Sequence, residues 1–389
     1  MYLHDLGIVC ALGAGKSEVL QAWLDVGRPW SEPAPWRSGG IRAFCVSAEL
    51  PVVPQRLNQY ACRNNRLLMA AVTQIESAVQ EAIRRYGTER IGVVLATSTS
   101  GIAEGEEAHR GLLAKGLMLD DYHYKQQELG GAAEFLSRYL EVRGPAFTVS
   151  TTCSSSANAL ASARRMLRLG ICDAVIVGGA DSLCRTTLEG FSALGAVSHD
   201  ACNPFSKNRD GTLIGEGAAV FLMSRDPSAI ALLGVGASAD AHHISAPRPD
   251  GACAYAAMQA ALNGAGLSPE SVDYINLHGT ATVQNDAMES RAVYQLFGNR
   301  VGCSSSKAST GHCLGAAGAI EAGLCWLLLS ELNTESLLPM HLWDGESDRT
   351  LPGLNFVTLE NRRLKRIQYC LSNSFSFGGN NVSLLIGRR

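Results

Sequence analysis

Short apolar, β-branched runs recur along this chain and alternate with stretches rich in alanine and leucine, and this alternation limits the fold more than any other feature. The runs are Ile91 to Ala96, Ala146 to Ser150, Ala174 to Val177, Ala218 to Met223, Val272 to Leu277, Gln368 to Leu371 and Val382 to Ile386. Helix-like stretches lie between several of them, as in Asn158 to Leu169, Ala254 to Ala265 and Ala317 to Ser330. Such alternation predicts a layered α/β fold with parallel pairing. Some neighbouring strands are joined too closely for a crossover helix, so we expect a mixed sheet.

The size and composition of the chain indicate a large folded core. It has 389 residues, of which 46% are hydrophobic and 18% charged, and this is more than one typical domain contains. A shallow break at Arg225 to Ser228 predicts two units, residues 1–226 and 227–389. Ala146 to Cys153 and Arg300 to Lys307 each run from a strand into a helix start, but this similarity alone does not establish a duplication.

Charge and cysteine usage exclude several classes of protein. A net charge of −3 argues against a general nucleic-acid binder, and no apolar run approaches the roughly 20 residues of a membrane span. No basic segment followed by a long apolar stretch begins the chain, so no export signal is expected. The twelve cysteines are dispersed without a Cys-x-x-Cys pair, which favours reduced, buried thiols over disulfides, and we predict no metal site. We therefore expect a cytoplasmic protein.

Gly13 to Ser17 resembles the end of a phosphate-binding P-loop. The segment reads Gly-Ala-Gly-Lys-Ser after the apolar run Leu6 to Leu12, and a P-loop lies between a strand and a helix. The complete pattern needs a glycine at position 10, which here is Cys10. A glycine turn with Ser17 near a helix start is the simpler interpretation, and nucleotide binding stays open as a remote alternative.

Cys153 lies in a run of small polar residues between a predicted strand and a predicted helix. The run reads Ser-Thr-Thr-Cys-Ser-Ser-Ser-Ala from Ser150 to Ala157. A helix start carries partial positive charge and free amide donors, which favour a thiolate, and small neighbours leave room for a substrate at a sharp strand-to-helix turn. On this segment alone, a buried structural cysteine and a nucleophile are equally good interpretations.

Two histidines lie in later polar segments. His278 follows the strand predicted to end at Leu277, and Thr280 and Thr282 come directly after it with hydroxyls for a polar ligand. His312 ends the segment Ser306-Lys307-Ala308-Ser309-Thr310-Gly311-His312. A histidine at a strand end points readily into a cleft, although a lone histidine is more often structural.

A lysine, a glutamate and two phenylalanines complete the set of candidates. Lys307 stands among small residues, and Glu321 lies on an apolar helix, where a charge requires a partner. Phe375 and Phe377 lie in a glycine turn between two strands. They are either part of the core or a mobile cover over a pocket.

Taken together, the order and spacing of these motifs are specific. The cysteine elbow is followed by His-Gly-Thr-x-Thr, then by Ser-Lys-x-x-x-Gly-His with Gly-Ala-Ala-Gly, and then by Asn-Ser-Phe-x-Phe-Gly-Gly. Over effectively its whole length the chain resembles the elongating β-ketoacyl–acyl-carrier-protein synthases, which are acyltransferases of type II fatty-acid and polyketide synthesis. The resemblance implies a thiolase fold, in which two similar βαβαβαββ halves form a five-layered αβαβα structure that is usually dimeric.

The resemblance also implies a decarboxylative Claisen condensation with malonyl carrier protein. Cys153 corresponds to the nucleophile that holds the acyl chain as a thioester, and His278 and His312 to the pair that promotes decarboxylation. Lys307 corresponds to a buried lysine and Glu321 to its ion-pair partner. Neutral imidazole N–H groups suit this chemistry, because loss of carbon dioxide leaves an enolate with developing negative charge.

Substrate contacts follow from the same resemblance. Thr280 and Thr282 match positions that bind the phosphopantetheine arm, and Phe377 with Phe375 matches the gate that moves as the acyl chain enters. The oxyanion is expected on the backbone amides of Cys153 and Phe377. No separate cofactor is expected, because both substrates arrive on the phosphopantetheine of an acyl carrier protein.

Arg63 and Arg66 are the predicted docking residues for that carrier protein. Their i,i+3 spacing places them on one helix face, and they resemble the basic pair that the family has beside the tunnel mouth. Acyl carrier proteins are acidic, so an overall acidic synthase needs a local basic patch. The alternative is an ordinary solvated helix face.

The sequence leaves two biosynthetic pathways open for the enzyme. The elbow reads Thr-Cys-Ser-Ser-Ser rather than the version usual in housekeeping fatty-acid enzymes, so a specialised elongase of the aryl-polyene type is the alternative to housekeeping elongation. In such systems the active chain pairs with a chain-length-factor subunit that has lost its cysteine. This chain keeps Cys153 and would be the catalytic partner, whether in a homodimer or a heterodimer.

Overall fold

Five strands of the first half form one side of a large mixed sheet in the computed structural model, which describes residues 1–25, 34–35, 41–118 and 120–389. They are β1 (Tyr2–Cys10), β5 (Ile91–Ala96), β6 (Ala146–Val149), β7 (Ala174–Asp181) and β9 (Gly217–Ser224), hydrogen-bonded in the order β6-β5-β7-β9-β1. β5 runs parallel to β6 and β7, whereas β9 is antiparallel to β7 and β1.

The second half repeats this arrangement strand for strand. Its strands are β10 (Ile230–Ala239), β11 (Tyr274–Asn276), β12 (Gly302–Ser304), β14 (Tyr369–Phe375) and β15 (Asn380–Arg388), in the order β12-β11-β14-β15-β10, with β13 (Asn355–Phe356) beside β12. β11 is parallel to β12 and β14, and β15 is antiparallel to β14 and β10. Numbered within its own half, each set therefore reads third, second, fourth, fifth, first. This shared topology is the internal repeat that sequence similarity alone did not establish.

The two halves join in one hydrogen-bonded sheet, because Tyr2 of β1 pairs with Ala231 of β10. The boundary predicted at residue 226 lies in the connection between β9 and β10. That the halves are two separate domains stays a prediction.

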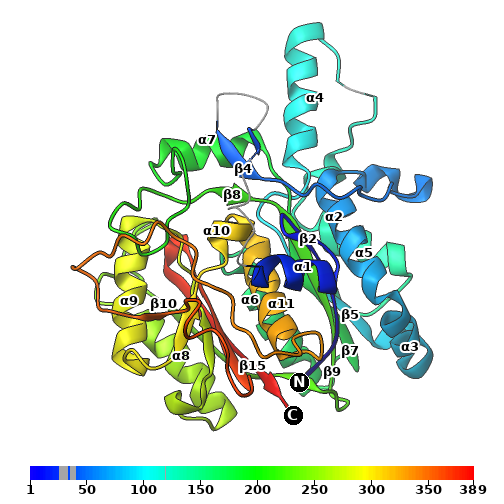
Figure 1. Cartoon of the computed structure of the whole chain (residues 1–389). Helices are drawn as coiled ribbons and strands as arrows, with labels where there is room; N and C mark the ends of the chain where they lie inside the picture. Colours follow the sequence, from blue (N-terminus) through cyan, green and yellow to red (C-terminus); the bar gives the residue numbers. More distant parts are fainter. Residues whose placement is uncertain (26–33, 36–40, 119) are drawn as a thin grey trace.

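Helices α6 (Ser155–Arg168) and α11 (Ala317–Leu329) lie between the two half-sheets (Figure 1). On β9, Ala219, Phe221 and Met223 face this central layer, while the residues between them face an outer layer. The outer layers are α2 (Arg63–Val72), α3 (Glu76–Tyr86) and α5 (Gly131–Leu140) on one side, and α8 (Ala252–Ala265) and α9 (Val283–Phe297) on the other. The mixed α/β, five-layered thiolase fold expected from the resemblance is confirmed.

The long strand β10 is absent from the predicted strands, and the reason is steric. β10 carries Gly234 and Gly236, and a side chain at either position would lie 1.9 Å from a carbonyl oxygen of α8. Glycine weakens a strand pattern, but here it allows the helix to approach the sheet closely.

The remaining elements lie around the layers. They are α1 (Lys16–Leu24), α4 (Ile102–Lys115), α7 (Arg185–Ala193), α10 (Lys307–Thr310), β2 (Gly13–Ala14) beside β1, and a small sheet of β3 (Ala34–Pro35), β4 (Arg42–Phe44) and β8 (Ile214–Gly215). Helix α4 projects from the body at the top of Figure 1. Within the described ranges, no helix is long and apolar enough to cross a membrane.

The Gly13 to Ser17 segment does not form a phosphate cradle. Gly13 and Ala14 pair with β1, and the Ala14 amide donates to the carboxylate of Glu18 at 3.0 Å. Lys16 forms an ion pair with Asp5 at 2.5 Å. Because the loop amide and the lysine are bound to the chain's own carboxylates, the nucleotide-binding alternative is not favoured.

Candidate active site

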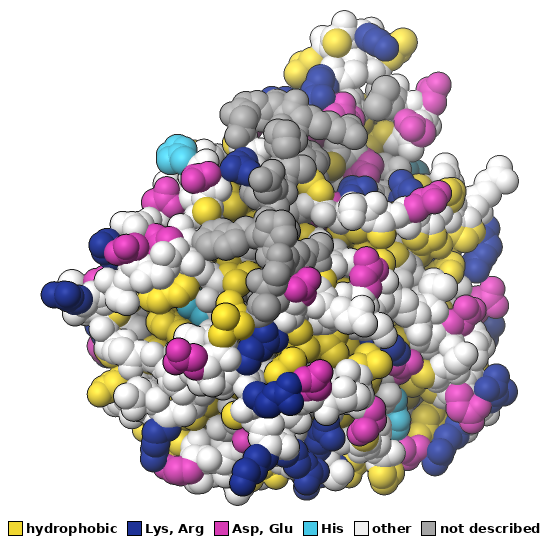
Figure 2. Space-filling model, viewed as in Figure 1, with side chains coloured by type: hydrophobic (Ala, Val, Ile, Leu, Met, Phe, Trp, Pro, Cys, Tyr) yellow, Lys and Arg dark blue, Asp and Glu magenta, His cyan; other side chains and the backbone are white. Residues whose placement is uncertain are grey.

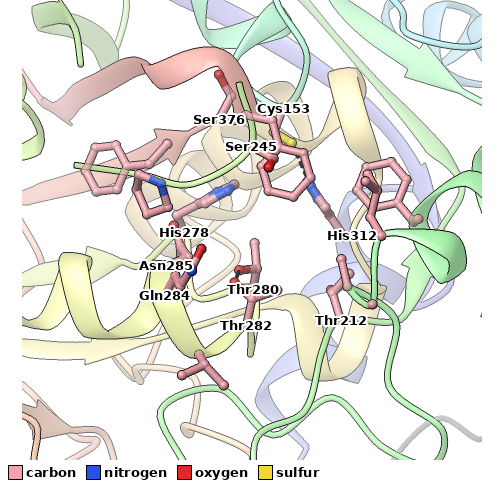
Figure 3. A pocket seen from close by; sticks show the side chains of 18 of the residues that line it. Cys153, Thr212, Ser245, His278, Thr280, Thr282, Gln284, Asn285, His312 and Ser376 are labelled. Atoms are coloured by element: carbon pink, nitrogen blue, oxygen red, sulfur yellow. Dashed lines mark hydrogen bonds between the residues drawn. The ribbon is translucent and has the colours of Figure 1, made fainter. Parts of the chain in front are cut away.

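Loops from both halves of the sheet enclose a cavity of about 360 Å³. Cys153 follows β6, His278 follows β11, and His312 follows β12 and α10. Figure 3 shows these three side chains around one hollow, with Thr280 and Thr282 at its side. The cavity is also lined by Phe191, Leu194, Thr212, Ser245, Phe375 and Phe377, among others.

Cys153 sits on a sharp turn between β6 and α6. Thr152, directly before it, has a φ of 55°, a conformation that is uncommon for a residue other than glycine. Burial raises the pKa of the Cys153 thiol to about 11, although the charge of Lys307 and the backbone N–H groups of Phe377 and Cys153 lower it. The helix-start argument predicted a thiolate, but desolvation outweighs it, so the resting group is a neutral thiol.

His312 contacts this thiol directly, with Nε2 2.9 Å from the Cys153 Sγ. Its backbone is fixed on both sides, since its N–H donates to Leu213 O at 2.7 Å and its carbonyl accepts from Gly215 N at 3.0 Å. Gly311, before it, has a φ of 68°, and a side chain there would lie 2.8 Å from the Gly215 nitrogen. Burial and the charge of Lys307 hold the pKa of His312 well below its usual value, so the imidazole is neutral.

A buried carboxylate binds the backbone at His278. The backbone N–H groups of His278 and Gly279 each donate to Glu289 of α9 at 2.7 Å. The His278 ring meets the His312 ring edge to face with centroids 5.6 Å apart. Burial, Lys307 and His312 together hold the pKa of His278 well below its usual value.

Lys307 and Glu321 form a fully buried ion pair. Their side chains are 0% and 3% exposed, and Nζ lies 2.5 Å from the Glu321 carboxylate. The same Nζ lies 3.4 Å from Nδ1 of His278. An ammonium group only donates, so Nδ1 accepts and the His278 proton is on Nε2. That tautomer places an N–H donor on the other side of the ring from Lys307.

The other predicted cavity residues are also in place. The Thr280 and Thr282 hydroxyls lie 2.9 Å apart and line the cavity with Phe375 and Phe377. Phe377 opens the short helical turn Phe377–Gly379 and stacks on Phe191 at 5.8 Å.

The matches to known proteins agree with this geometry. Residues 42–229 match the N-terminal domain of beta-ketoacyl synthase, and residues 230–339 match its C-terminal domain. The chain belongs to the β-ketoacyl synthase family. It is therefore an acyltransferase that carries out the elongating condensation.

Three relatives place this ketosynthase within the family. It is 34% identical to 3-oxoacyl-[acyl-carrier-protein] synthase 2 of Synechocystis, over 83% of this chain and 82% of that protein. It is 46% identical to a solved structure from Xenorhabdus doucetiae described as a ketosynthase (ApeO) in complex with its chain length factor (ApeC), with a TM-score of 0.93 over 100% of this chain and 98% of that one. The ishigamide ketosynthase/chain length factor structure is 27% identical, with a TM-score of 0.86 over 100% and 98% of the chains.

Two predicted docking residues of this ketosynthase are engaged within the chain itself. Arg63 donates from Nε and Nη2 to the two oxygens of buried Glu216, at 2.8 and 2.5 Å. Arg66 donates to the carbonyl oxygens of Leu50 and Pro51 at 2.7 and 2.9 Å. On the face shown in Figure 2, basic and acidic side chains are likewise interspersed. The docking role stays a prediction, and the pairing with Glu216 gives Arg63 a structural role in addition.

Sequence reasoning missed Glu289 and Phe191. Glu289 follows His278 by eleven residues within an ordinary helical pattern, and only the folded contact shows that it binds the His278 loop. Phe191 lies on α7, which was not predicted. The ligand atoms of Cys153, His278 and His312 lie within 4.8 Å of one another, a spacing a metal could use, but the sequence predicts none.

Proposed function

We propose that this chain is the catalytic ketosynthase of a specialised type II pathway, in which it pairs with a chain-length-factor-like subunit. The observation that carries the catalytic part is the 2.9 Å contact between Cys153 Sγ and His312 Nε2, in one cavity with His278. The three side chains supply a nucleophile and two neutral imidazoles, as a decarboxylative condensation requires.

The first step loads the acyl chain onto Cys153. The thiol is neutral at rest, so it gives its proton to His312 Nε2 as the sulfur attacks the thioester carbonyl of the acyl carrier protein. The backbone N–H groups of Cys153 and Phe377 face this sulfur and bind the tetrahedral oxyanion. The intermediate then expels the pantetheine sulfur, which takes the proton back from His312. An acyl-Cys153 thioester remains.

The second step forms the carbon–carbon bond. Once Cys153 is acylated, it has no proton to offer to His312, and the neutral ring carries its own proton on Nε2. Malonyl carrier protein then binds with its thioester oxygen at the Nε2–H donors of His278 and His312. The bond to the carboxylate breaks, carbon dioxide leaves, and its electron pair forms an enolate that these two N–H groups stabilise. The enolate carbon attacks the acyl-Cys153 carbonyl, the Cys153 thiolate leaves, and it takes one proton from solvent to regenerate the thiol. Lys307 stays paired with Glu321 and keeps His278 in the Nε2–H tautomer.

The pathway assignment rests on the comparisons. The identity is 46% over the whole chain for the ketosynthase solved with its chain length factor, against 34% over 83% of the chain for 3-oxoacyl-[acyl-carrier-protein] synthase 2. Because this chain keeps Cys153, it would be the catalytic member of such a pair, and an aryl-polyene-type chain is the proposed product. We place the enzyme in the cytoplasm, with substrates on phosphopantetheine and no resident cofactor, so a chelator should leave activity unchanged.

Mass spectrometry of the chain co-expressed with its carrier protein and the candidate partner tests the proposal. A polyenoyl group on Cys153, together with a heterodimer in native mass spectrometry, is the expected result. A homodimer loaded only with saturated acyl groups supports housekeeping elongation instead. Absence of any acyl group on Cys153 with active carrier protein would overturn the catalytic assignment.

A further inference from the structure

A third buried histidine lies behind the active site, outside the set of side chains that line the cavity. His341 is 4% exposed and belongs to the irregular segment between α11 and β13. Its backbone N–H donates to Val357 O at 2.9 Å, which anchors the segment to the end of β13.

Both ring nitrogens of His341 have backbone partners from other segments. Nε2 lies 3.0 Å from the carbonyl oxygen of Pro204, and Nδ1 lies 3.3 Å from the backbone nitrogen of Ser305. A carbonyl only accepts, so Nε2 carries the proton and Nδ1 accepts from the Ser305 N–H. One neutral imidazole therefore bridges two loops that are about a hundred residues apart in the sequence.

An aromatic cluster packs around the His341 ring. Phe356 stacks on His341 with centroids 4.2 Å apart and an interplanar angle of 13°. Phe205 and Trp343 pack at tilted angles with centroids 6.0 and 5.4 Å away. Burial lowers the pKa of His341 to about 4, so the acceptor at Nδ1 is maintained at neutral pH.

Ser305 connects His341 to the two loops that carry His278 and Lys307. Its hydroxyl donates to Gly279 O at 2.8 Å, next to His278, and accepts from the backbone N–H of Lys307 at 3.3 Å. A side chain at Gly279 would lie 2.6 Å from the Ser305 Cβ, so the two loops are already in close contact. A displacement of Ser305 would move His278 and Lys307 relative to each other.

The Pro204 side of the bridge holds a strained turn. Phe205 has a φ of 63°, which is a rare conformation for a bulky side chain. Its backbone N–H donates to Asp286 at 2.7 Å, and the preceding carbonyl accepts from His341. These two hydrogen bonds fix the turn from both sides.

We propose that His341 is a positioning residue for decarboxylation, which acts through the Ser305 amide to set the spacing between His278 and Lys307. The proposal rests on the proposed function, because it assigns His278 and Lys307 to the decarboxylation half of the reaction. Acyl loading depends on Cys153 and His312, which have no contact with His341, and it should be independent of the bridge.

Two substitutions separate the two ends of the bridge. In His341→Asn the amide oxygen can take the place of Nδ1 and accept from Ser305, while the contact to Pro204 is lost. In His341→Gln the longer side chain can take the place of Nε2 and donate to Pro204, while the contact to Ser305 is lost. Phe356→Leu is the matched control, since it removes the stacked ring but leaves both hydrogen bonds.

Three measurements on the full-length enzyme decide the matter: the melting temperature, acylation of Cys153 and carbon dioxide release from malonyl carrier protein. We expect all three variants to lower the melting temperature and to load acyl groups within about twofold of wild type. Carbon dioxide release should fall about tenfold or more in His341→Gln, and less than about threefold in His341→Asn and Phe356→Leu.

Equal losses of carbon dioxide release in the Asn and Gln variants, or losses that follow the melting temperature in all three, would overturn the proposal and leave His341 as a core residue. Failure of the wild-type enzyme to load Cys153 at all would instead overturn the proposed function, so the two failures are distinguishable.

Discussion

The third strand of each half ends in a loop that carries chemistry, but the two loops do different work. After β6, the chain turns sharply at Thr152 and presents Cys153 to the cavity. After β12, it enters α10 with Lys307, whose side chain is completely buried against Glu321 and does not line the cavity. Equivalent positions of a repeated topology thus hold a nucleophile in one half and a fixed charge in the other.

The two halves share a strand topology but place side chains of different function at equivalent positions. The nucleophile must reach the substrate, so small residues surround it. The charge must not reach the substrate, since its effect on His278 depends on exclusion of water, which strengthens electrostatic interactions. The predictions below test this division.

Cys153→Ala should have the largest effect. It removes the only group proposed to hold the acyl chain, so acylation and condensation should fall to background, whereas malonyl decarboxylation should continue because both histidines remain. Intact-protein mass spectrometry and carbon dioxide release measure the two steps. Cys45→Ala, a half-buried cysteine outside the cavity, is the control. Chain elongation by Cys153→Ala would show that the nucleophile is elsewhere.

Lys307→Ala should damage both stability and decarboxylation. It leaves Glu321, which is 3% exposed, as an unpaired buried charge, at a cost of about 3–5 kcal/mol in unfolding free energy. Replacing both partners, as in Lys307→Met with Glu321→Leu, should restore most of the stability but not the decarboxylation. Denaturant unfolding and carbon dioxide release measure the two effects. A double variant that regains both would mean that the charge itself has no role in catalysis.

The neutral Cys153 thiol should be visible in its alkylation rate. Because burial raises its pKa to about 11, the thiolate fraction, and with it the rate of reaction with iodoacetamide, should rise about tenfold per pH unit between pH 7 and 9. Peptide mass spectrometry of Cys153 against time gives the rate. A plateau below pH 8 would show that the helix start and Lys307 outweigh burial after all.

Substitutions of Arg63 and Arg66 on α2 should have the smallest effects, and the two effects should differ in kind. Arg63→Ala leaves the buried Glu216 carboxylate, which is 1% exposed, without its ion-pair partner. Because Arg63 is itself 35% exposed, we expect the free energy of unfolding to fall by only about 1–2 kcal/mol. Activity should fall equally with carrier-bound and pantetheine substrates. Arg66→Glu should raise the apparent KM for the carrier protein in a salt-dependent way and leave small pantetheine thioesters nearly unaffected. If Arg66→Glu lost equal activity with the carrier protein and with small pantetheine thioesters, α2 would have no docking role.

Features that depend on neighbouring residues in the sequence could be predicted, whereas features that depend on contacts between distant segments could not. β5 was predicted with its observed limits, Ile91 to Ala96, because a buried parallel strand is a continuous apolar run. The grouping of Cys153, His278, Lys307 and His312 in one site came from motif resemblance. Cys153, His278 and His312 line one cavity, and the Lys307 Nζ lies 3.4 Å from Nδ1 of His278.

Other features could not be read from local pattern. β10 was missed because Gly234 and Gly236 serve the packing of α8 rather than strand propensity. The pKa of the Cys153 thiol depends on its burial, and on the charge of Lys307 and the backbone N–H of Phe377, which belong to the other half of the chain. The hydrogen bonds that Glu289 accepts from the His278 loop, and those that link His341 to Pro204 and Ser305, join separate segments, and no spacing rule covers them.

The pairing of Tyr2 with Ala231 has a mechanical consequence. Because one continuous sheet passes through both halves, a hinge between them would have to break main-chain hydrogen bonds near its axis. We therefore expect the substrate to enter without a clamp-like opening of the two halves. Access then depends on local rearrangement around the cavity, which Phe375 and Phe377 line. Hydrogen exchange should accordingly be slow along β1 and β10.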